Sequence, residues 1–365
     1  MIEILKAGTL TTIQDSGRLG YQELGVPETG ALDAFSFRCA NLLAGNDENA
    51  PVMEAVLFGP QVKFSDDSFI AITGGDLSPA IDGAKVNLWE TLQVSAGSIL
   101  SFSGPIGKGI RSYIAISGGF SGDKTRSVMG SYSTYLPGGF GGYEGRALKD
   151  DDVLHIGEPD KKFEGGLVFE NPPYFGDDET LRIILGPQDD MFAPAAIQTL
   201  ISNSYQVTPN SDRMGCRLDG PVLEHLDGPD VISDGTAFGV IQVPGDGKPI
   251  ILLSDRGTTG GYTKIATVIS ADRSKLAQLM PGGNVNFEVV SQEKAVNLLK
   301  DQERLLSSIK VHGGVPFNIK VNGMSVDIVD DDNQPAIGIN IEHTTYKAVV
   351  SDGHQDHEIE LEISE

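Results

Sequence analysis

The sequence predicts a mainly β protein with few short helices, built from β-barrels or sandwiches and ending in a small β appendage. Short apolar or alternating runs bounded by Gly, Pro, Asp or Ser recur along the chain, whereas helical stripes are few. The 365 residues include 45 glycines and 19 prolines, a composition typical of many turns.

Strands are expected wherever a short apolar run is closed by turn residues. Asp82-Gly83 separates Ala80-Ile81 from Val86, which predicts a hairpin turn. The clearest other runs are Val62–Phe64, Phe69–Thr73, Ile99–Ser103, Ser112–Ser117, Leu181–Leu185, Ile250–Leu253, Thr267–Ser270 and Val285–Val290.

Four segments predict helices. Asp33 is a suitable N-cap for the segment AFSFRCANLLA, which ends at Gly45. The segment Gln188–Ile201 predicts a second helix, with Pro194 as a break or a first-turn residue. Asp272 is expected to cap a short SKLAQL helix. Ser291 opens the clearest helix, whose apolar residues recur at helical spacing.

Composition divides the chain into three parts. Gly, Pro, Glu and Asp crowd between His155 and Thr180, and a second change falls between Ile309 and Val315. The predicted domains are therefore residues 1–165, 166–310 and 311–365. In the last part, FNIKVNGMSVDIV alternates around Asn322-Gly323, which predicts a hairpin in an acidic appendage.

Charge and cysteine content exclude several classes of protein. With 27 Lys and Arg against 51 Asp and Glu, the net charge is −24, which disfavours nucleic acids and anionic membranes. Cys39 and Cys216 are expected to be buried and unbridged. The N-terminal segment does not resemble a signal peptide and no apolar run is long enough to span a bilayer, so a soluble cytoplasmic protein is expected.

Familiar catalytic signatures do not occur. The segment Gly104–Ser112 contains a Gly-Lys pair but lacks the P-loop spacing, and no Met-Lys-Met hairpin offers a lysine for biotin. His343, His354 and His357 could hold a metal, but a solvated acidic face explains them better, so no metal site is predicted.

Three polar, glycine-rich stretches are the candidate sites. Thr12–Asp33 places Asp15 and Arg18 on pliable backbone, either as a site-forming loop or as a connection with a structural ion pair. Met129–Leu148 combines Ser131, Ser133, Thr134 and Arg146 with several glycines, as a lid over a site or as a solvent loop.

The third stretch, Ser254–Ser270, carries its polar groups on a turn between apolar strands, a common design for a site. Ser211–Gly220 adds Arg213 and Arg217. Arginine, threonine and backbone NH groups on such turns suit a carboxylate, carbonate or phosphate better than they suit simple structural pairs.

These stretches resemble the family called allophanate hydrolase subunit 2, or the KipA-like carboxyltransferases. The resemblance rests on TTIQDSGRLGYQELGVPETGALD, MGSYSTY, GGFGGYEGRAL, SDRMGCRLDG and DRGTTGGYTKIATVISAD, in that order. It implies cyclophilin-like β-barrel domains and a partner resembling subunit 1 of allophanate hydrolase (KipI-like), with a third subunit of the LamB/YcsF type. The sequence departs from the family pattern at Gly257, where Gln is usual, and at Cys216, where an aromatic residue is usual.

The resemblance also implies three alternative functions. The first is the C-type subunit of an ATP-dependent 5-oxoprolinase, which opens 5-oxoproline to glutamate. The second is the carboxyltransferase of a biotin-dependent urea or amide carboxylase, with biotin on a separate carrier. The third is a KipA-like antagonist of a kinase inhibitor. ATP would be used by the assembly, and the substrate would be a small carboxylate or amide.

The expected site residues come from the same stretches. Arg256 and Arg213 are predicted to hold an anionic group, while Asp15 orients Arg18 or acts as a base. The predicted catalytic residues are Asp15, Arg18, Arg256, Thr258, Thr259, Tyr262 and Lys264. The predicted substrate-binding residues are Arg213, Gly260, Gly261, Ser133, Thr134 and Arg146.

Overall fold

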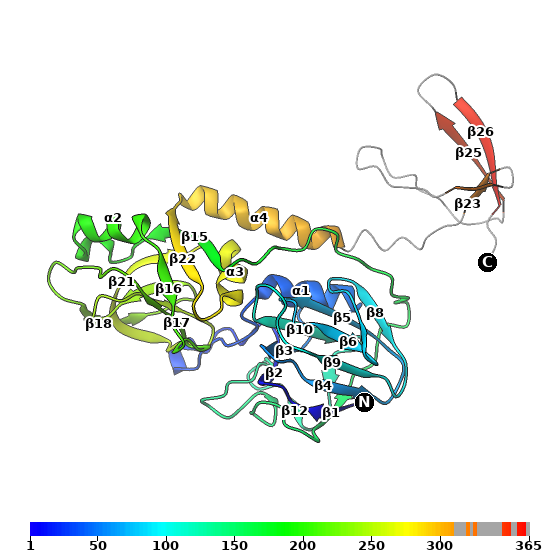
Figure 1. Ribbon diagram of the computed structural model, residues 1–365, viewed down its shortest axis with the longest axis horizontal. Helices are drawn as coiled ribbons and strands as arrows, with labels where there is room; N and C mark the ends of the chain where they lie inside the picture. The colour runs from blue at the N-terminus through cyan, green and yellow to red at the C-terminus, as the bar shows by residue number, and fades with distance from the viewer. Residues whose placement is uncertain (310–318, 322–323, 327–344, 352–355, 363–365) are drawn as a thin grey trace. The chain divides into compact units, whose positions relative to one another are not determined.

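The computed structural model describes residues 1–309, 319–321, 324–326, 345–351 and 356–362. The chain forms two compact units, Met1–Gly313 and Gly314–Glu365. The mainly β fold that the sequence predicts is confirmed, and strands predominate in both units. Strands β1–β14 of the larger unit form a first lobe, and β15–β22 form a second lobe (Figure 1).

Two sheets enclose the core of the first lobe. The larger sheet has the strand order β11-β14-β1-β4-β9-β6-β7, and the smaller has the order β2-β3-β10-β5-β8. Their strands are β1 Ile2–Lys6, β2 Leu10–Gln14, β3 Val52–Val56, β4 Gln61–Phe64, β5 Ser68–Gly74, β6 Pro79–Ile81, β7 Ala84–Lys85, β8 Thr91–Val94, β9 Ile99–Phe102, β10 Arg111–Ile116, β11 Phe120–Ser121 and β14 Val153–Ile156. A separate pair joins β12 Thr125–Arg126 to β13 Gly142–Tyr143.

The second lobe contains a closed barrel. Its sheet has the order β15-β22-β16-β17-β20-β19-β21-β18, and β15 also pairs with β21. The ring therefore closes through seven strands, and β18 pairs outside it along β21. The strands are β15 Asp178–Leu185, β16 Tyr205–Val207, β17 Gly215–Asp219, β18 Asp230–Gly235, β19 Val240–Val243, β20 Ile250–Leu252, β21 Thr259–Val268 and β22 Asn284–Val289.

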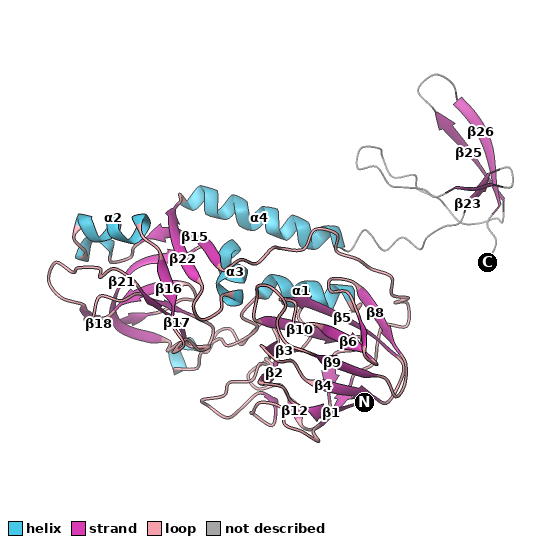
Figure 2. Cartoon of the chain, in the orientation of Figure 1, coloured by secondary structure: helices cyan, strands magenta, loops and turns pink. Residues whose placement is uncertain are grey.

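The helices lie mainly on one side of the strands (Figure 2). The four predicted helical segments are confirmed as α1 Ala34–Leu43, α2 Pro194–Ser202, α3 Arg273–Gln278 and α4 Gln292–Ile309, with short 3₁₀ turns η1 Gln22–Leu24, η2 Asp189–Met191 and η3 Ser270–Asp272. As predicted, the side chain of Asp33 accepts from the backbone NH of Ser36 and caps α1.

Helix α4 links the two lobes. Its first turn is capped by Ser291, whose Oγ accepts from the NH of Lys294, and the helix contacts η3 of the second lobe. Further along, Arg38 of α1 pairs with Glu303 of α4 at 2.6 Å. Leu306 then packs into the core formed by α1 and its neighbours. The apolar stripe of this helix is therefore divided between both lobes.

The structure corrects three details of the sequence prediction. Thr12–Gln14 belong to the buried strand β2 rather than to a loop. Strand β21 already begins at Thr259, because Gly260 pairs with Asp234 of β18 and this tertiary pairing outweighs the low strand propensity of glycine. Asp272 stands at the N-cap of α3, but its carboxylate binds Arg182 instead of capping the helix.

The smaller unit is described only in part. Its sheet has the order β24-β23-β26-β25, with β23 Ile319–Val321, β24 Met324–Val326, β25 Thr345–Ser351 and β26 Asp356–Glu362. The predicted hairpin pairing of β23 with β24 is confirmed. His343, His354 and the turn residues Asn322 and Gly323 lie outside the described residues. Cys39 and Cys216 are free and buried, as predicted. Among the helices of the described residues, none is long and apolar enough to cross a membrane.

Candidate functional site

The structure joins the candidate stretches through the opening segment. Asp15 follows β2 and is buried, and its carboxylate accepts from four groups. Oδ1 accepts from the NH of Gly17 at 2.9 Å and from the hydroxyls of Ser131 and Ser133, while Oδ2 accepts from the NH of Tyr132. Asp15 thus anchors the second stretch onto the first.

Arg18 reinforces this junction without a direct bond to Asp15. Its Nη1 donates to Thr29 Oγ1 at 2.6 Å and its Nη2 to the carbonyl of Ser133 at 2.6 Å. The guanidinium also lies 4.9 Å from the ring centroid of Phe140. Burial lowers the pKa of Arg18, and the neighbouring Asp15 opposes that effect. Arg18 and Asp15 therefore fix two segments in place, and both are occupied by protein partners.

Gly141 permits this close approach. Its φ is +75°, and a Cβ there would meet the carbonyl oxygen of Ser133 at 2.1 Å and Nη2 of Arg18 at 2.7 Å. Gly141→Ala is therefore expected to lower the free energy of unfolding by about 2–4 kcal/mol in urea denaturation. Gly139→Ala is the matched control, because its φ of +66° is similar and a Cβ would meet nothing within 4 Å. Equal losses in the two variants would contradict the steric argument.

The opening segment also reaches the second lobe. The NH of Thr29 donates to the carbonyl of Ser254 at 3.1 Å, and the carbonyl of Gly30 accepts from Arg213 at 2.6 Å. Glu28 forms an ion pair with Arg256 at 2.9 Å. One segment therefore contacts all three other stretches that the sequence singles out.

Arg213 is the centre of a buried ionic network between the lobes. It binds both carboxylate oxygens of Asp255 and also pairs with Glu54 of β3. Glu54 in turn accepts from the hydroxyl of Tyr113 at 2.9 Å and from the NH of Leu32 at 3.0 Å. Burial acts to lower the pKa of Arg213, but the two carboxylates outweigh it and raise the pKa. The donors of Arg213 are thus committed to the protein.

A pocket of about 420 Å³ opens on the barrel of the second lobe, and we call it the Arg256 pocket. Alternate residues of its strands face opposite sides, as the period of a strand requires. The pocket is lined by Met214, Gly215, Arg217, Gln242, Pro244, Asp246, Ile250, Leu252, Arg256, Gly257 and Tyr262. The intervening residues belong to the barrel core, namely Cys216, Leu218, Ile241, Val243 and Ile251.

Two buried nitrogen donors in this pocket are unpaired. Arg256 is 3% exposed and Gln242 is 7% exposed. Neither Nε of Arg256 nor Nε2 of Gln242 has a hydrogen-bond partner among the described residues. An unpaired buried donor is costly and rare in a native protein. The presence of two such donors in residues of one pocket makes this pocket the candidate site.

Gly260 and Lys264 adjoin this donor pair. A Cβ on Gly260 would lie 2.4 Å from Nε2 of Gln242, so only glycine leaves room for the amide as it stands. Lys264 lies opposite Gln242 in the pairing of β19 with β21, and its Nζ is 3.3 Å from Asp234. Lys264 is buried and does not line the pocket.

Charges in the pocket nearly balance. Arg217 and Asp246 lie on its wall, and Arg256 is paired with Glu28. The pKa of the nearby Arg273 is lowered by burial and by the charge of Arg256, and Glu28 only partly opposes these two effects. The arrangement suits a ligand with a single negative charge better than a polyanion.

The predicted site residues fall into three groups. Arg256, Tyr262 and Gly260 line or adjoin the pocket, and Gly257 lies on its rim. Thr258, Thr259 and Gly261 flank it on the loop and on β21, while Lys264 pairs with Asp234. The remaining predicted residues lie away from the pocket and bind protein partners. Those in the first-lobe junction are Asp15, Arg18, Ser133 and Thr134. Arg213 lies between the lobes, and Arg146 pairs with Asp152 and Glu144.

Sequence reasoning missed Gln242, Glu54 and Asp255. Two of them carried a signal, since Gln242 interrupts the apolar strand VIQV and Glu54 interrupts VMEAV. A single polar residue inside an otherwise apolar strand requires a partner or a function. Cys216, one of the two departures from the family pattern, faces the core, whereas Gly257 faces the pocket.

Comparisons with known proteins agree with this architecture. The chain is 38% identical over 309 residues to the C-type subunit of 5-oxoprolinase from Escherichia coli (strain K12), covering 85% of this chain and 97% of that protein. It is 35% identical over 327 residues to urea amidolyase of Saccharomyces cerevisiae, covering 84% of this chain but only 18% of that protein. The solved structure of urea amidolyase from K. lactis matches with a TM-score of 0.78 at 31% identity, covering 84% of this chain and 20% of that chain.

The family match spans most of both lobes. Residues 24–289 match the model described as carboxyltransferase domain, subdomain A and B. The relatives named above are enzymes or enzyme subunits. The family that the sequence motifs suggest is therefore confirmed, and this chain belongs to the carboxyltransferase domain family with subdomains A and B.

Proposed function

We propose that this chain is the C-type subunit of a 5-oxoprolinase and that the Arg256 pocket holds the substrate. The relative from Escherichia coli supports this choice, because the match covers nearly the whole of that protein. The observation that carries the assignment of the pocket is the pair of unpaired buried donors, Arg256 Nε and Gln242 Nε2. Both residues line one pocket, and its size is typical of small-molecule sites.

The chemistry of the pocket matches 5-oxoproline. The substrate carries one carboxylate and one lactam carbonyl, so it needs a cationic donor and a neutral donor. We assign Arg256 to the carboxylate and Gln242 to the lactam oxygen, where a donor stabilises negative charge that develops during ring opening. The apolar side chains of Ile250, Leu252 and Tyr262 would pack on the ring.

The remaining predicted residues have supporting roles in this proposal. Glu28 holds Arg256 in place, and Asp15 and Arg18 fix the segment that carries Glu28. Arg213 fixes that segment to the second lobe through Gly30. Thr258, Thr259 and Gly261 shape the turn beside the pocket. These residues would act on the substrate through Arg256 rather than by contact.

The pocket does not suit a nucleotide triphosphate. A triphosphate needs several cationic donors and backbone NH groups at once. Within the described residues, the pocket has Arg217 and Arg256 against Asp246 and Glu28, so little net positive charge is left for it. We therefore place the use of ATP elsewhere in the assembly, on the partner of subunit-1 type or on a third subunit.

Glutamate release tests the proposal. We would mix this chain with its two presumed partner subunits, 5-oxoproline and ATP, with and without avidin. The expected result is glutamate formation only in the full mixture and without sensitivity to avidin. If a folded, co-purifying assembly forms no glutamate, the proposal is wrong.

The relatives named urea amidolyase support a second candidate function, that of a carboxyltransferase using biotin from a separate carrier. Avidin distinguishes the two, because it would block transfer from a biotinylated carrier to urea or an amide. Binding to a kinase inhibitor without turnover would instead indicate the regulatory function.

Gly257 is expected to set the size of the accepted substrate. A Cβ there would meet only the carbonyl oxygen of Thr259, at 3.2 Å, and its φ is not in the left-handed region. Gly257→Gln should therefore fold normally, narrow the pocket and raise KM by about tenfold, a loss of about 1.4 kcal/mol of binding. Gly235→Gln is the matched control, because its φ is also outside the left-handed region, a Cβ there would meet nothing within 4 Å and the residue does not line the pocket. A KM that is unchanged in Gly257→Gln would contradict this prediction.

A further inference from the structure

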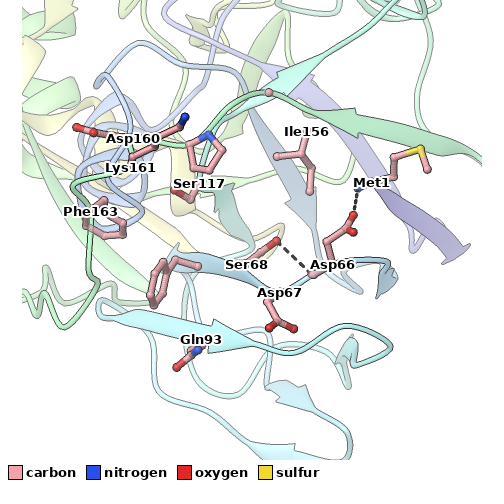
Figure 3. A pocket seen from close by; sticks show the side chains of 13 residues that line it. Met1, Asp66, Asp67, Ser68, Gln93, Ser117, Ile156, Asp160, Lys161 and Phe163 are labelled. Atoms are coloured by element: carbon pink, nitrogen blue, oxygen red, sulfur yellow. Dashed lines mark hydrogen bonds and ion pairs between the residues drawn. The ribbon is translucent and has the colours of Figure 1, made fainter.

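The first lobe contains a second pocket of about 420 Å³, which shares no residue with the Arg256 pocket. It lies where β5 and β8 meet the segment that follows β14. Figure 3 shows Asp66, Asp67 and Gln93 on one side of it and Asp160, Lys161 and Phe163 on the other. The remaining lining residues are Met1, Ser68, Phe69, Ser117, Ile156, Gly157 and Pro159.

Ser117, whose hydroxyl is buried, is one of the residues that line this pocket. Ser117 is 5% exposed, and its Oγ has no hydrogen-bond partner among the described residues. Its backbone is fixed by a bond from its NH to the carbonyl of Phe69 at 2.8 Å. A hydroxyl that is buried without a partner is costly, and a polar group of a ligand would remove that cost.

An aromatic pair forms the apolar part of the wall. Phe69 and Phe163 lie with ring centroids 5.4 Å apart at an interplanar angle of 85°. Such an edge-to-face pair presents both a ring face and a ring edge. Flat apolar groups and cations both interact favourably with ring faces.

The rim of the pocket is acidic. Oδ1 of Asp67 accepts from the NH of Ala96 at 2.7 Å, and Oδ1 of Asp160 accepts from the NH of Lys162 at 3.0 Å. Backbone bonds thus hold both carboxylates in place and leave their charge unneutralised. Two cations also line the pocket: the N-terminal ammonium of Met1, which pairs with Asp66 at 3.0 Å, and Lys161. Three carboxylates therefore face two cations, and in a chain of net charge −24 the rim favours cations over anions.

We propose that this pocket binds a small primary amine carried on a flat apolar body with a terminal hydroxyl. The protonated amine lies against Asp67, the body packs on Phe69 and Phe163, and the hydroxyl bonds to Ser117 Oγ. Three features of different kinds meet in this one cavity: a buried unpaired hydroxyl, an aromatic pair and an acidic rim.

Calorimetric titration of the full chain with three compounds tests the proposal. Tyramine has all three features, 2-phenylethylamine lacks the hydroxyl, and 3-(4-hydroxyphenyl)propionate replaces the amine by a carboxylate. Tyramine is expected to bind with a Kd of about 1 mM or lower, 2-phenylethylamine several-fold more weakly, and the propionate not at all. If the propionate binds as well as tyramine, or if tyramine does not bind, the proposal is wrong.

Three variants locate the binding site. Asp67→Asn keeps the side-chain oxygen that accepts from the NH of Ala96. It should weaken the binding of tyramine about tenfold, the effect expected from the loss of a charge-assisted bond at an exposed rim. Asp227→Asn removes an exposed carboxylate in the second lobe and should change nothing. Ser117→Ala should weaken the binding of tyramine until its Kd equals that of 2-phenylethylamine. The Kd of 2-phenylethylamine itself should not change. Equal effects of Ser117→Ala on both amines would overturn the role of the hydroxyl.

Discussion

Arg256→Gln is expected to lower kcat/KM of the assembled enzyme about 100-fold, which corresponds to about 3 kcal/mol lost from a charged bond to substrate. The free energy of unfolding should change by less than about 1 kcal/mol, because the Glu28 partner is 29% exposed and can be rehydrated. The variant also removes the unpaired Nε, which costs the free protein stability. Steady-state glutamate release and urea denaturation measure the two quantities.

Arg304→Gln is the matched control for this experiment. Arg304 lies on α4 with its side chain 77% exposed, and among the described residues its ion-pair partner is Asp301, one turn away. The same substitution there should leave both activity and stability unchanged. A loss of several kcal/mol of stability in Arg256→Gln would show that Arg256 is a structural residue and not a ligand of the substrate.

Arg213→Met is expected to lower the free energy of unfolding by about 3–5 kcal/mol, as breaking a buried ion pair typically does. The substitution leaves Glu54 and Asp255 without their cation, and their side chains are only 1% and 2% exposed. Buried carboxylates that have lost their partner must be desolvated without compensation. The free energy of unfolding of Arg213→Lys should lie between those of Arg213→Met and the unsubstituted protein. A lysine keeps the positive charge but lacks the planar guanidinium that binds two carboxylates and a carbonyl at once.

A rescue experiment separates charge from packing. Glu54→Gln and Asp255→Asn, added to Arg213→Met, should recover more than half of the lost stability, because no uncompensated charge is then buried. Urea denaturation of the single and triple variants provides the comparison. If the triple variant is no more stable than Arg213→Met, the loss comes from packing.

Local sequence signals were sufficient for the four helices of the described residues and for several of the strands. Asp33 and Ser291 were recognisable as caps because capping depends on a few neighbouring residues. Strand β21 was underestimated because Thr259 and Gly260 are paired by β18, a strand that lies about thirty residues earlier and has no local signal for this pairing.

The candidate site was only partly predictable for a related reason. The stretches containing Asp15 and Arg256 were recognisable from their polar, glycine-rich composition. Whether an arginine faces a ligand or a carboxylate depends on residues distant in sequence. Arg213 is occupied because Glu54 lies 159 positions away, and no spacing rule connects these two residues. The three-dimensional structure was therefore needed to tell that the donors of Arg213 are occupied by protein groups, whereas Nε of Arg256 is unpaired among the described residues.

The packing of Leu306 has a consequence for synthesis of the chain on the ribosome. This side chain from α4 belongs to the same core as Phe35, Leu43 and Trp89 of the first lobe. Because translation proceeds from the N-terminus and domains generally fold as they emerge, that core lacks Leu306 until α4 has left the exit tunnel. The main apolar face of α1 already packs on β5 and β10 by then, so the patch that Leu306 covers is the part left open while the second lobe is being made.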